Sequence, residues 1–542
     1  MKSAGPGPAG MAWIAGGTFR MGSDDWYPEE SPAHAATVDG FWIDRHPVTV
    51  ADFSTFIAAT SYVTVAGPRF TFRYHKADRA VLERYVPAML DRAFTTFVTH
   101  YGFKPSIPIG VELYADREHF AVRTSGLPQT AIQGVCFGRT LAAMSPQKES
   151  FNLGMTLWHE LSHVFHIQLS QSRVPRWFTE GLAEYETSLA RAEWTREQDP
   201  ELYELRRAGR LPSVEGMNRA FTRAEQLTDI GTAYYASSRL VALLGEKHGM
   251  SALAAMLKLW GEGKETAEVF RVALGITLAE EDTRFGASLD SAFVRYSSTF
   301  VPVSRTGSIE LATELTLREP KSAARKAALA LTFIRAGHAV AAEQALAAAR
   351  ALDERDPDVR FLTARLSLAK SSPADAMKEL RAMLGEGHDG YEVEMLLAEA
   401  ADALHDAATR LAAVRAAEHF DPTQVAPLYA LLKLADESGD ADGALALLER
   451  LARLSEHDAG LHRELLRRLL ARGDYAGAAR IGEAAIYTDM LGFETHRGFA
   501  EALAKTGDKQ RAAFELETAL LCDADPPDLA AAKSALAKLR KH

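Results

Sequence analysis

The sequence predicts a multidomain protein in which an α+β domain precedes an all-α helical solenoid. Three observations support this fold class: a spacing of 34 residues that recurs through the C-terminal part, a change to an Ala- and Leu-rich composition from about residue 312, and alternating apolar patterns between residues 70 and 113. At 542 residues and 47% hydrophobic content, the chain is long enough to bury several separate cores.

The repeat is clearest at turn positions spaced 34 residues apart. They are Gly337, Ser371, His405, Gly439, Gly473 and Gly507, and five positions after each the register reads Ala342, Ala376, Arg410, Ala444, Ala478 and Ala512. Glycine suits the tight turn between paired helices, and alanine lets the second helix approach its neighbour closely. A period of 34 residues is typical of a helix-turn-helix solenoid.

The segments LARGDYAGAARIGEAA and LAKTGDKQRAAFELETAL resemble tetratricopeptide repeats. The resemblance implies about six repeats over residues 312–542 that form an all-α superhelix and bind a protein partner on its concave face. Arg410 departs from the pattern, so we expect the third repeat to be distorted. An unspecialised helical bundle is the alternative.

Residues 67–305 are predicted to form the α+β domain. FTFRYH, residues 70–75, has the composition of a strand, and the apolar residues of IPIGVELY alternate as in a half-buried strand: Ile107, Ile109, Val111 and Leu113. Residues 300–310 contain Pro, Ser and Gly and are predicted to be a linker.

Residues 1–66 form a third unit. GGTFRMGSDD, followed by FWIDRHPVTVADFSTFIAATSYVTVA, resembles the start of the formylglycine-generating enzyme family, also called sulfatase-modifying factors. The cysteine-bearing catalytic portion of that family has no counterpart in this sequence. We therefore expect a partial domain that carries over no activity and either packs Trp42 against the next domain or stays partly disordered.

Charge and cysteine content restrict the partners and the compartment. The net charge of −11 argues against nucleic acid and against anionic lipid as general partners. The two cysteines, Cys136 and Cys522, are too few and too far apart for a disulfide framework. The N-terminal residues lack the apolar core of a signal peptide, and no window has the apolar length of a membrane span. We expect a cytoplasmic protein.

The decapeptide TLWHELSHVF carries a candidate metal site. Residues 156–169 contain neither Pro nor Gly and have apolar residues at helical intervals, so they predict a helix. On that helix His159 and His163 lie one turn apart and can direct two imidazoles at one ion. Glu160 follows the first histidine and can reach a metal-bound water as a general base. Two core histidines bonded to the backbone are the alternative.

A catalytic zinc ion needs a third protein ligand, and the best candidate is Glu180 in RWFTEGLAEYE. Gly181 permits close helix packing, and Glu184, one turn further on, can orient a liganding histidine from the second shell. Glu184 is also the substitute if Glu180 only complements a helix N-terminus. We interpret His166 as structural.

HELSH together with WFTEGLAEY resembles the gluzincin metallopeptidases, the group that includes thermolysin and the zinc aminopeptidases. The resemblance covers about residues 70–300 and implies a thermolysin-like α+β fold with Zn²⁺ as cofactor. It also implies that Tyr235 donates a hydrogen bond to the reaction's oxyanion, with Tyr234 as its competitor.

The resulting hypothesis is a zinc-dependent peptidase, with endopeptidase favoured over aminopeptidase because no GxMEN-like segment precedes the histidine helix. IQGVCFGRTLAAM is the strand expected in its place. The alternative from another class is a tetratricopeptide-repeat scaffold or adaptor with an inactive or structural metallopeptidase-like domain. A formylglycine-type modifier is a third, weaker hypothesis.

Overall fold

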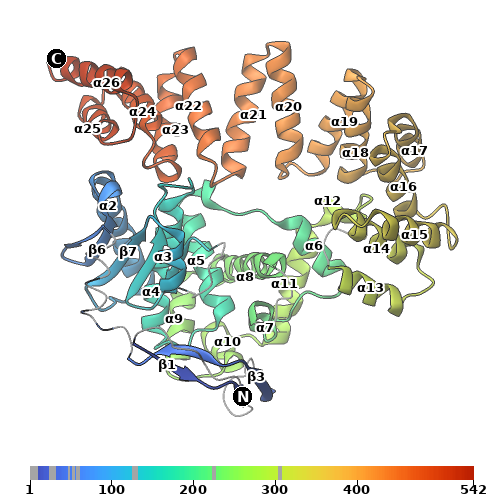
Figure 1. The fold of residues 1–542 in the computed structure, drawn as a ribbon, viewed down its shortest axis with the longest axis horizontal. Coiled ribbons are helices and arrows are strands. Elements are labelled where there is room, and N and C mark those ends of the chain that lie inside the picture. The colour runs from blue at the N-terminus through green and yellow to red at the C-terminus, as the bar shows by residue number, and fades with distance from the viewer. Residues whose placement is uncertain are drawn as a thin grey trace.

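The structure is a computed structural model, and it describes residues 10–22, 32–46, 49, 51, 55, 61–124, 132–222, 227–302 and 308–541. A small N-terminal β region precedes a mixed sheet with helices, and a long helical array follows (Figure 1). Part of the predicted linker, at residues 303–307, and most of residues 47–60 of the formylglycine-type resemblance lie outside the described residues.

The N-terminal region consists of two separate two-stranded sheets. Its strands are β1 (Met11–Ile14), β2 (Gly17–Met21), β3 (His34–Val38) and β4 (Phe41–Asp44). β1 pairs with β4 and β2 with β3, both antiparallel. Trp42 contacts Trp13 edge to face within this region, at 5.3 Å between ring centroids. Phe19 and Met21 are half exposed, at 49% and 52%, so this region leaves apolar surface uncovered.

A five-stranded sheet forms the centre of the α+β domain. Its strands are β5 (Tyr62–Ala66), β6 (Phe70–His75), β7 (Ile109–Tyr114), β8 (Gly134–Cys136) and β9 (Thr140–Met144), in the order β5-β6-β7-β9-β8. β6, β7 and β9 are parallel, and antiparallel strands lie at both edges. The predicted strands at residues 70–75 and 109–113 are confirmed, whereas Ile107 lies outside its strand and is half exposed. IQGVCFGRTLAAM forms two strands, β8 and β9.

Helices surround this sheet and build the rest of the domain. They are α2 (Lys76–Tyr101), α3 (Arg117–Thr124), α4 (Leu153–Leu169), α5 (Arg176–Ala190), the short 3₁₀ helix η2 (Ala192–Trp194), α6 (Asp199–Arg207), α7 (Met217–Thr222), α8 (Leu227–His248), α9 (Met250–Gly261), α10 (Thr266–Leu274), α11 (Leu278–Ala292) and α12 (Val294–Ser297). The long helix α2 packs against α4 through buried aromatic rings of Phe97, Trp158 and Phe165. Within the described residues, no single helix has the length and apolarity to cross a membrane; the bent pair Gly231–His248 and Met250–Gly261 meets those criteria only jointly.

The C-terminal array begins with α13 (Ile309–Arg318) and continues as helical hairpins. Their helices are α14 (Ala323–Arg335), α15 (Ala339–Arg350), α16 (Pro357–Ala369), α17 (Pro373–Gly385), α18 (Tyr391–Ala403), α19 (Ala407–Phe420), α20 (Val425–Ser438), α21 (Ala441–Leu454), α22 (Ala459–Arg472), α23 (Tyr475–Thr488), α24 (Phe493–Thr506) and α25 (Lys509–Ala519), followed by α26 (Pro526–Leu539). Every turn position of the 34-residue register has a left-handed φ, between 57° at His405 and 99° at Gly507. The predicted helix-turn-helix solenoid is confirmed.

The expected distortion of the third repeat is wrong. α18 and α19 form a hairpin like the others, and His405 adopts the left-handed turn with φ 57°. Arg410 replaces the small residue without disruption because its guanidinium reaches sideways to Asp402 and to Glu437, the latter at 3.4 Å. The long side chain is therefore accommodated between neighbouring helices, where it pairs with Asp402 of α18 and Glu437 of α20 and is only 19% exposed.

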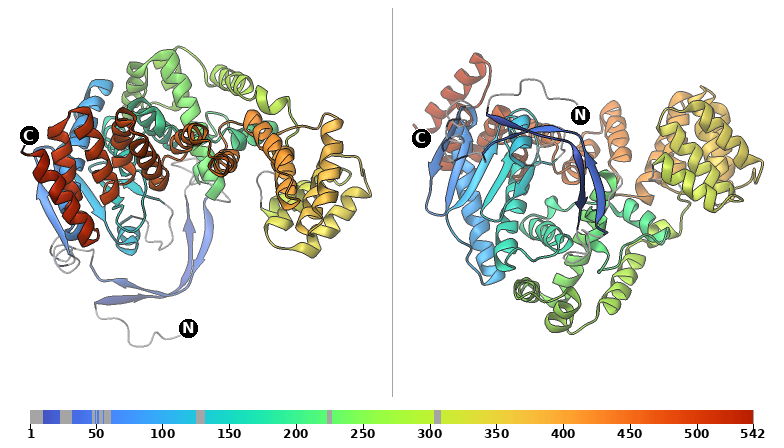
Figure 2. Two further views of the ribbon diagram at one scale, coloured as in Figure 1. Left: turned by 90° about the horizontal axis from the view of Figure 1, so that it is seen from above. Right: turned by 60° about the horizontal axis from the view of Figure 1, so that its bottom comes forward.

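The two ends of the array differ in how closely they pack against the α+β domain. We call α14–α21 the outer repeats, and the loop 455–458 together with α22–α26 the docked repeats. The docked repeats lie beside α2 and share the core of the α+β domain through residues such as Tyr487, Met490 and Phe499 (Figures 1 and 2). The outer repeats α14–α19 extend away from that domain and build cores of their own, centred on Leu331 and Leu380. A further core around Leu448 and Leu465 joins α20 and α21 to α22, α23 and α24. The loop before α18 is joined to the segment that precedes the array, where the Phe300 amide donates to the Asp389 carbonyl at 2.7 Å.

Candidate metal centre

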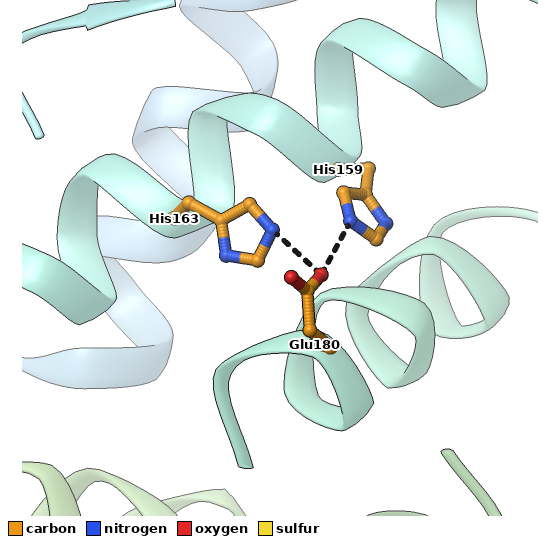
Figure 3. A group of neighbouring side chains, drawn as sticks. All are labelled: His159, His163 and Glu180. Carbon is orange, nitrogen blue, oxygen red and sulfur yellow. Dashed lines mark ion pairs between the residues drawn. The ribbon is translucent and has the colours of Figure 1, made fainter. Parts of the chain in front are cut away.

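Helix α4 carries two of the predicted metal ligands. Its N-terminus is capped by Asn152, whose side-chain oxygen accepts a hydrogen bond from the Met155 amide at 2.8 Å. Apolar residues bury the helix, so its position is fixed on nearly every side. His159 and His163 lie one turn apart on the face that turns toward α5 (Figure 3).

Helix α5 brings the third predicted ligand into place. A Cβ on Gly181 would lie 2.4 Å from the Ser237 carbonyl oxygen of α8, so α5 can pack this closely only with glycine at that position. The packing turns Glu180 toward the two histidines. Gly181 was predicted to allow close approach to the histidine helix α4, but the helix that it allows to approach closely is α8.

The three side chains converge on one point. Oε2 of Glu180 lies 3.5 Å from Nε2 of His159 and 3.3 Å from Nε2 of His163, and the three ligand atoms all lie within 4.8 Å of one another (Figure 3). Ligands at about 2.1 Å from a tetrahedral zinc ion are separated by about 3.4 Å. The spacing of these atoms therefore suits a zinc ion bound by two imidazoles and one carboxylate.

An ion pair and a hydrogen bond orient the two imidazole rings. Nδ1 of His159 lies 3.2 Å from Oε1 of Glu184, and Nδ1 of His163 lies 2.8 Å from the Thr179 hydroxyl. These contacts direct the Nε2 atom of each ring inward, as metal ligation requires. Glu184 lies against the Nδ1 side of His159, and Glu180 lies on its Nε2 side. Thr179 was missed by sequence reasoning; its only signal is its position directly before Glu180.

His166 lies behind the cluster in a buried network. Its Nε2 lies 2.8 Å from the Tyr101 hydroxyl, which donates to Glu186 at 2.7 Å, and its Nδ1 lies 3.1 Å from the Thr179 hydroxyl. Burial lowers the pKa of His166 well below its usual value. The structure thus places His166 as a neutral support for Thr179. Trp158 and Trp177 are buried packing residues.

Electrostatics within the cluster favour a bound cation. Burial disfavours the charged form of His159, but Glu180 and Glu184 outweigh it and raise the pKa of this imidazole to about 10. Burial also acts to raise the pKa of Glu180, yet His163 and His159 hold that pKa well below its usual value. Carboxylate charge is therefore concentrated beside the two imidazoles, which favours a bound cation.

Glu160 points toward the edge of the sheet. A Cβ on Gly134 of β8 would lie 2.6 Å from Oε1 of Glu160, so this glycine is needed where the strand passes the carboxylate. Glu160 is 7% exposed, and burial raises its pKa. The three ligand atoms do not include Glu160. It lies beside the cluster, close enough for the charges of His159 and His163 to act on its pKa.

The two tyrosines of α8 have different surroundings. The Tyr235 hydroxyl donates to Asp199 at 2.7 Å and accepts from Arg239 at 3.0 Å. Tyr234 is the tyrosine that interacts with Arg176 and Glu180, and burial followed by the Glu180 charge raises its pKa. The structure therefore associates Tyr234 with the cluster and Tyr235 with an ion-pair network. The gluzincin resemblance favoured Tyr235, and its competitor Tyr234 is the one beside Glu180.

Comparison with known proteins concerns the N-terminal part. The family model for the sulfatase-modifying factor enzyme 1-like domain matches residues 2–137, further than the expected boundary at 66. The chain is 58% identical over 53 residues to the formylglycine-generating enzyme of Mycobacterium tuberculosis (strain ATCC 25618 / H37Rv), covering 10% of this chain and 18% of that protein. It is 42% identical over 86 residues to that of Thermomonospora curvata, covering 14% of this chain and 28% of that one. The chain therefore spans less than a third of the length of either relative.

Solved structures that overlap with the chain include helical-repeat proteins. A tetratricopeptide repeat protein from Parabacteroides merdae is 16% identical, with a TM-score of 0.26, over 41% of this chain and 88% of that one. The Cut9–Hcn1 assembly gives 11% identity and a TM-score of 0.26, over 71% of this chain and 77% of that one. Because these TM-scores are low, the assignment of the repeats is based on the 34-residue spacing of the helical hairpins.

These matches correct the peptidase assignment. The enzyme class expected from HELSH and WFTEGLAEY, a hydrolase acting as a zinc metalloprotease, is wrong: the matching family and the curated relatives are formylglycine-generating enzymes. The thermolysin-like description of the α+β domain likewise has no support among these matches. The convergence of His159, His163 and Glu180 is a separate observation and stands on its own geometry.

Proposed function

We propose that the protein is a scaffold that binds a peptide or protein partner on its helical repeats, while a zinc ion bound by His159, His163 and Glu180 stabilises the adjoining domain. The observation that carries this proposal is the unbroken register of left-handed turns from Gly337 to Gly507, which generates one continuous array of hairpins. Such arrays use their extended inner surface for binding.

The first helices of the hairpins are the proposed binding surface. First helices of successive repeats contact one another: α14 with α16, α16 with α18, and α22 with α24. In a curved array, the helices that contact the corresponding helix of the next hairpin line the concave side. Tyr429 on the first helix α20 is 43% exposed, and a large exposed ring of this kind is typical of residues that anchor a partner.

A structural role for the ion is supported by the way the domain is built. The ligands come from two helices, α4 and α5, that are otherwise held by apolar packing, and binding one ion would join them directly. Zinc supplies this kind of cross-link through imidazole and carboxylate ligands. Cytoplasmic location is part of the proposal, since Cys136 and Cys522 are both free thiols.

A peptide-array screen with the full chain tests the scaffold proposal. We expect a defined set of peptides to bind, with binding reduced at least about tenfold by Tyr429→Ala, the usual scale of an aromatic anchor. Val340→Ala is the matched control, because Val340 is exposed on a second helix, α15. A zinc-loaded chain that instead cleaves the peptides, and loses this with Glu160→Gln, would contradict the proposal.

A second candidate, formylglycine generation, is favoured by the 58% identity of the N-terminal segment to a formylglycine-generating enzyme. It would require that the matched part alone performs the reaction of proteins several times its length. Incubation of the chain with a cysteine-containing peptide in air, followed by mass spectrometry, tests it. An unmodified cysteine would remove this candidate.

A further inference from the structure

We infer that the docked repeats contribute positioning residues to the metal centre, through a chain of charges from Glu456 to Arg196, to Glu184 and to His159. The inference rests on the metal site proposed above and adds a partner to it: the loop between α21 and α22, residues 455–458, which lies almost three hundred positions from the ligands in the sequence.

The loop contacts the start of the ligand helix directly. The Asn152 side-chain amide donates to the Glu456 carbonyl at 3.1 Å, and the Asn152 backbone amide donates to Nδ1 of His457 at 3.1 Å. The same Asn152 caps α4 through its side-chain oxygen. The repeat loop therefore holds the residue that starts the helix on which both histidines lie.

A second contact fixes the same turn of α4. A Cβ on Gly154 would lie 2.3 Å from the Tyr487 ring of α23, so the ring rests on the helix backbone itself. Tyr487 is held there from the other side, since Arg92 of α2 donates to its hydroxyl at 2.8 Å and Trp194 contacts its ring at 5.4 Å between centroids. α4 cannot shift along its axis without displacing the docked repeats.

The charge chain runs from this loop to a ligand. Nε of Arg196 lies 3.8 Å from Oε1 of Glu456 and 3.6 Å from Oε2 of Glu184, and Oε1 of Glu184 lies 3.2 Å from Nδ1 of His159. Glu184 is buried, so its charge is poorly screened. Arg196 thus divides its positive charge between the repeat loop and the carboxylate that orients His159.

The sign of the effect follows from that division. Without the Glu456 charge, the guanidinium would act on Glu184 alone, which weakens the hold of Glu184 on the His159 ring and leaves more positive charge beside the cation. Both changes disfavour zinc. Direct second-shell partners typically change metal affinity about 10- to 100-fold, so a residue one step further out is expected to change it about 5-fold.

The test is zinc titration of the full chain against a chromophoric chelator. Glu456→Gln is expected to weaken zinc binding about 5-fold, and to have no added effect in an Arg196→Gln background, because Glu456 acts through Arg196. Glu449→Gln is the matched control, since Glu449 pairs with Arg480 at 3.1 Å on the exposed surface of the array. Urea unfolding of the zinc-free variants checks that both fold like the parent.

The outcomes separate the inference from the metal site itself. A parent that binds zinc with a Glu456→Gln variant of equal affinity would overturn the inference and leave the site intact. Equal losses from Glu456→Gln in both backgrounds would also overturn it, because the effect would then bypass Arg196. A parent that binds no zinc would overturn the proposed site.

Discussion

The docked repeats and the outer repeats share one 34-residue register but differ in what they pack against. Residues of the docked repeats, such as Tyr487 and Phe499, belong to the same core as the sheet and the ligand helix. The outer repeats form smaller cores around Leu331 and Leu380 that involve few residues from outside the array, and a third core around Leu448 joins α20 and α21 to the docked repeats. The difference shows that a repeat can contribute side chains to the core of a neighbouring domain and still keep the geometry of its helical hairpin.

The largest expected effect is on the free energy of unfolding, when a tyrosine is replaced by alanine in the docked repeats and in the outer repeats. Tyr487→Ala should lower the free energy of unfolding by about 3 kcal/mol, because it removes a buried ring and leaves a cavity against α4. Tyr429→Ala in the outer repeats should cost under about 1 kcal/mol, since Tyr429 is 43% exposed. Urea unfolding monitored by circular dichroism measures both. Similar losses would mean that the two parts are equally independent of the α+β domain.

Metal removal should act on the docked part more than on the outer part. Zinc at about 100 times its dissociation constant stabilises a folded protein by about 2.7 kcal/mol. A chelator should therefore lower the thermal midpoint of the parent and increase hydrogen exchange in α4 and the 455–458 loop, with little change in α16–α19. His163→Ala is the control, as it should not respond to chelator. An equal increase in hydrogen exchange along the whole array would contradict the expected difference between the docked and the outer repeats.

A pH effect is expected in the outer repeats. Burial, followed by the nearby Asp389 carboxylate, raises the pKa of Glu394 to about 7. Because the folded pKa lies above the unfolded one, the folded state binds more protons, and stability falls as the pH rises from about 4.5 to about 7 and then levels off. Glu394→Gln should remove this decline, a gain of about 1 kcal/mol at pH 8. Unfolding curves at pH 5 and pH 8 would measure it; an unchanged slope in the variant would contradict the assignment.

The smallest effect concerns the turn of the third repeat. His405 adopts φ 57°, a conformation that costs an ordinary side chain about 1 kcal/mol and costs glycine little. His405→Gly should therefore raise the thermal midpoint slightly, and Gly439→Ala at the equivalent turn should lower it. A loss of stability in His405→Gly would show that the histidine ring makes a contact worth more than the turn strain.

Sequence reasoning predicted features set by local spacing. The turn positions from Gly337 to Gly507 were predictable because a left-handed turn and a small facing residue recur in every unit. His159, His163 and Glu180 were predictable as a group because helical spacing and a nearby second helix place them. In both cases the residues that predict the feature lie close together in the sequence, within one repeat or within two adjacent helices.

Features set by tertiary contact were not predictable. Nothing local to Tyr487 distinguishes it from Tyr429, yet only Tyr487 meets Gly154 of the ligand helix. Thr179 carries a single hydroxyl whose partners, His163 and His166, lie on another helix. The distortion expected at Arg410 did not occur because Asp402 and Glu437 accept its charge, and neither residue belongs to the repeat pattern.

The central claim is that this chain holds one metal ion between α4 and α5. Native mass spectrometry of the purified chain in micromolar zinc tests it most directly. The account predicts one zinc ion per chain for the parent and none for the His159→Ala, His163→Ala double variant. A parent that remains metal-free, or a double variant that still binds one ion, would contradict it.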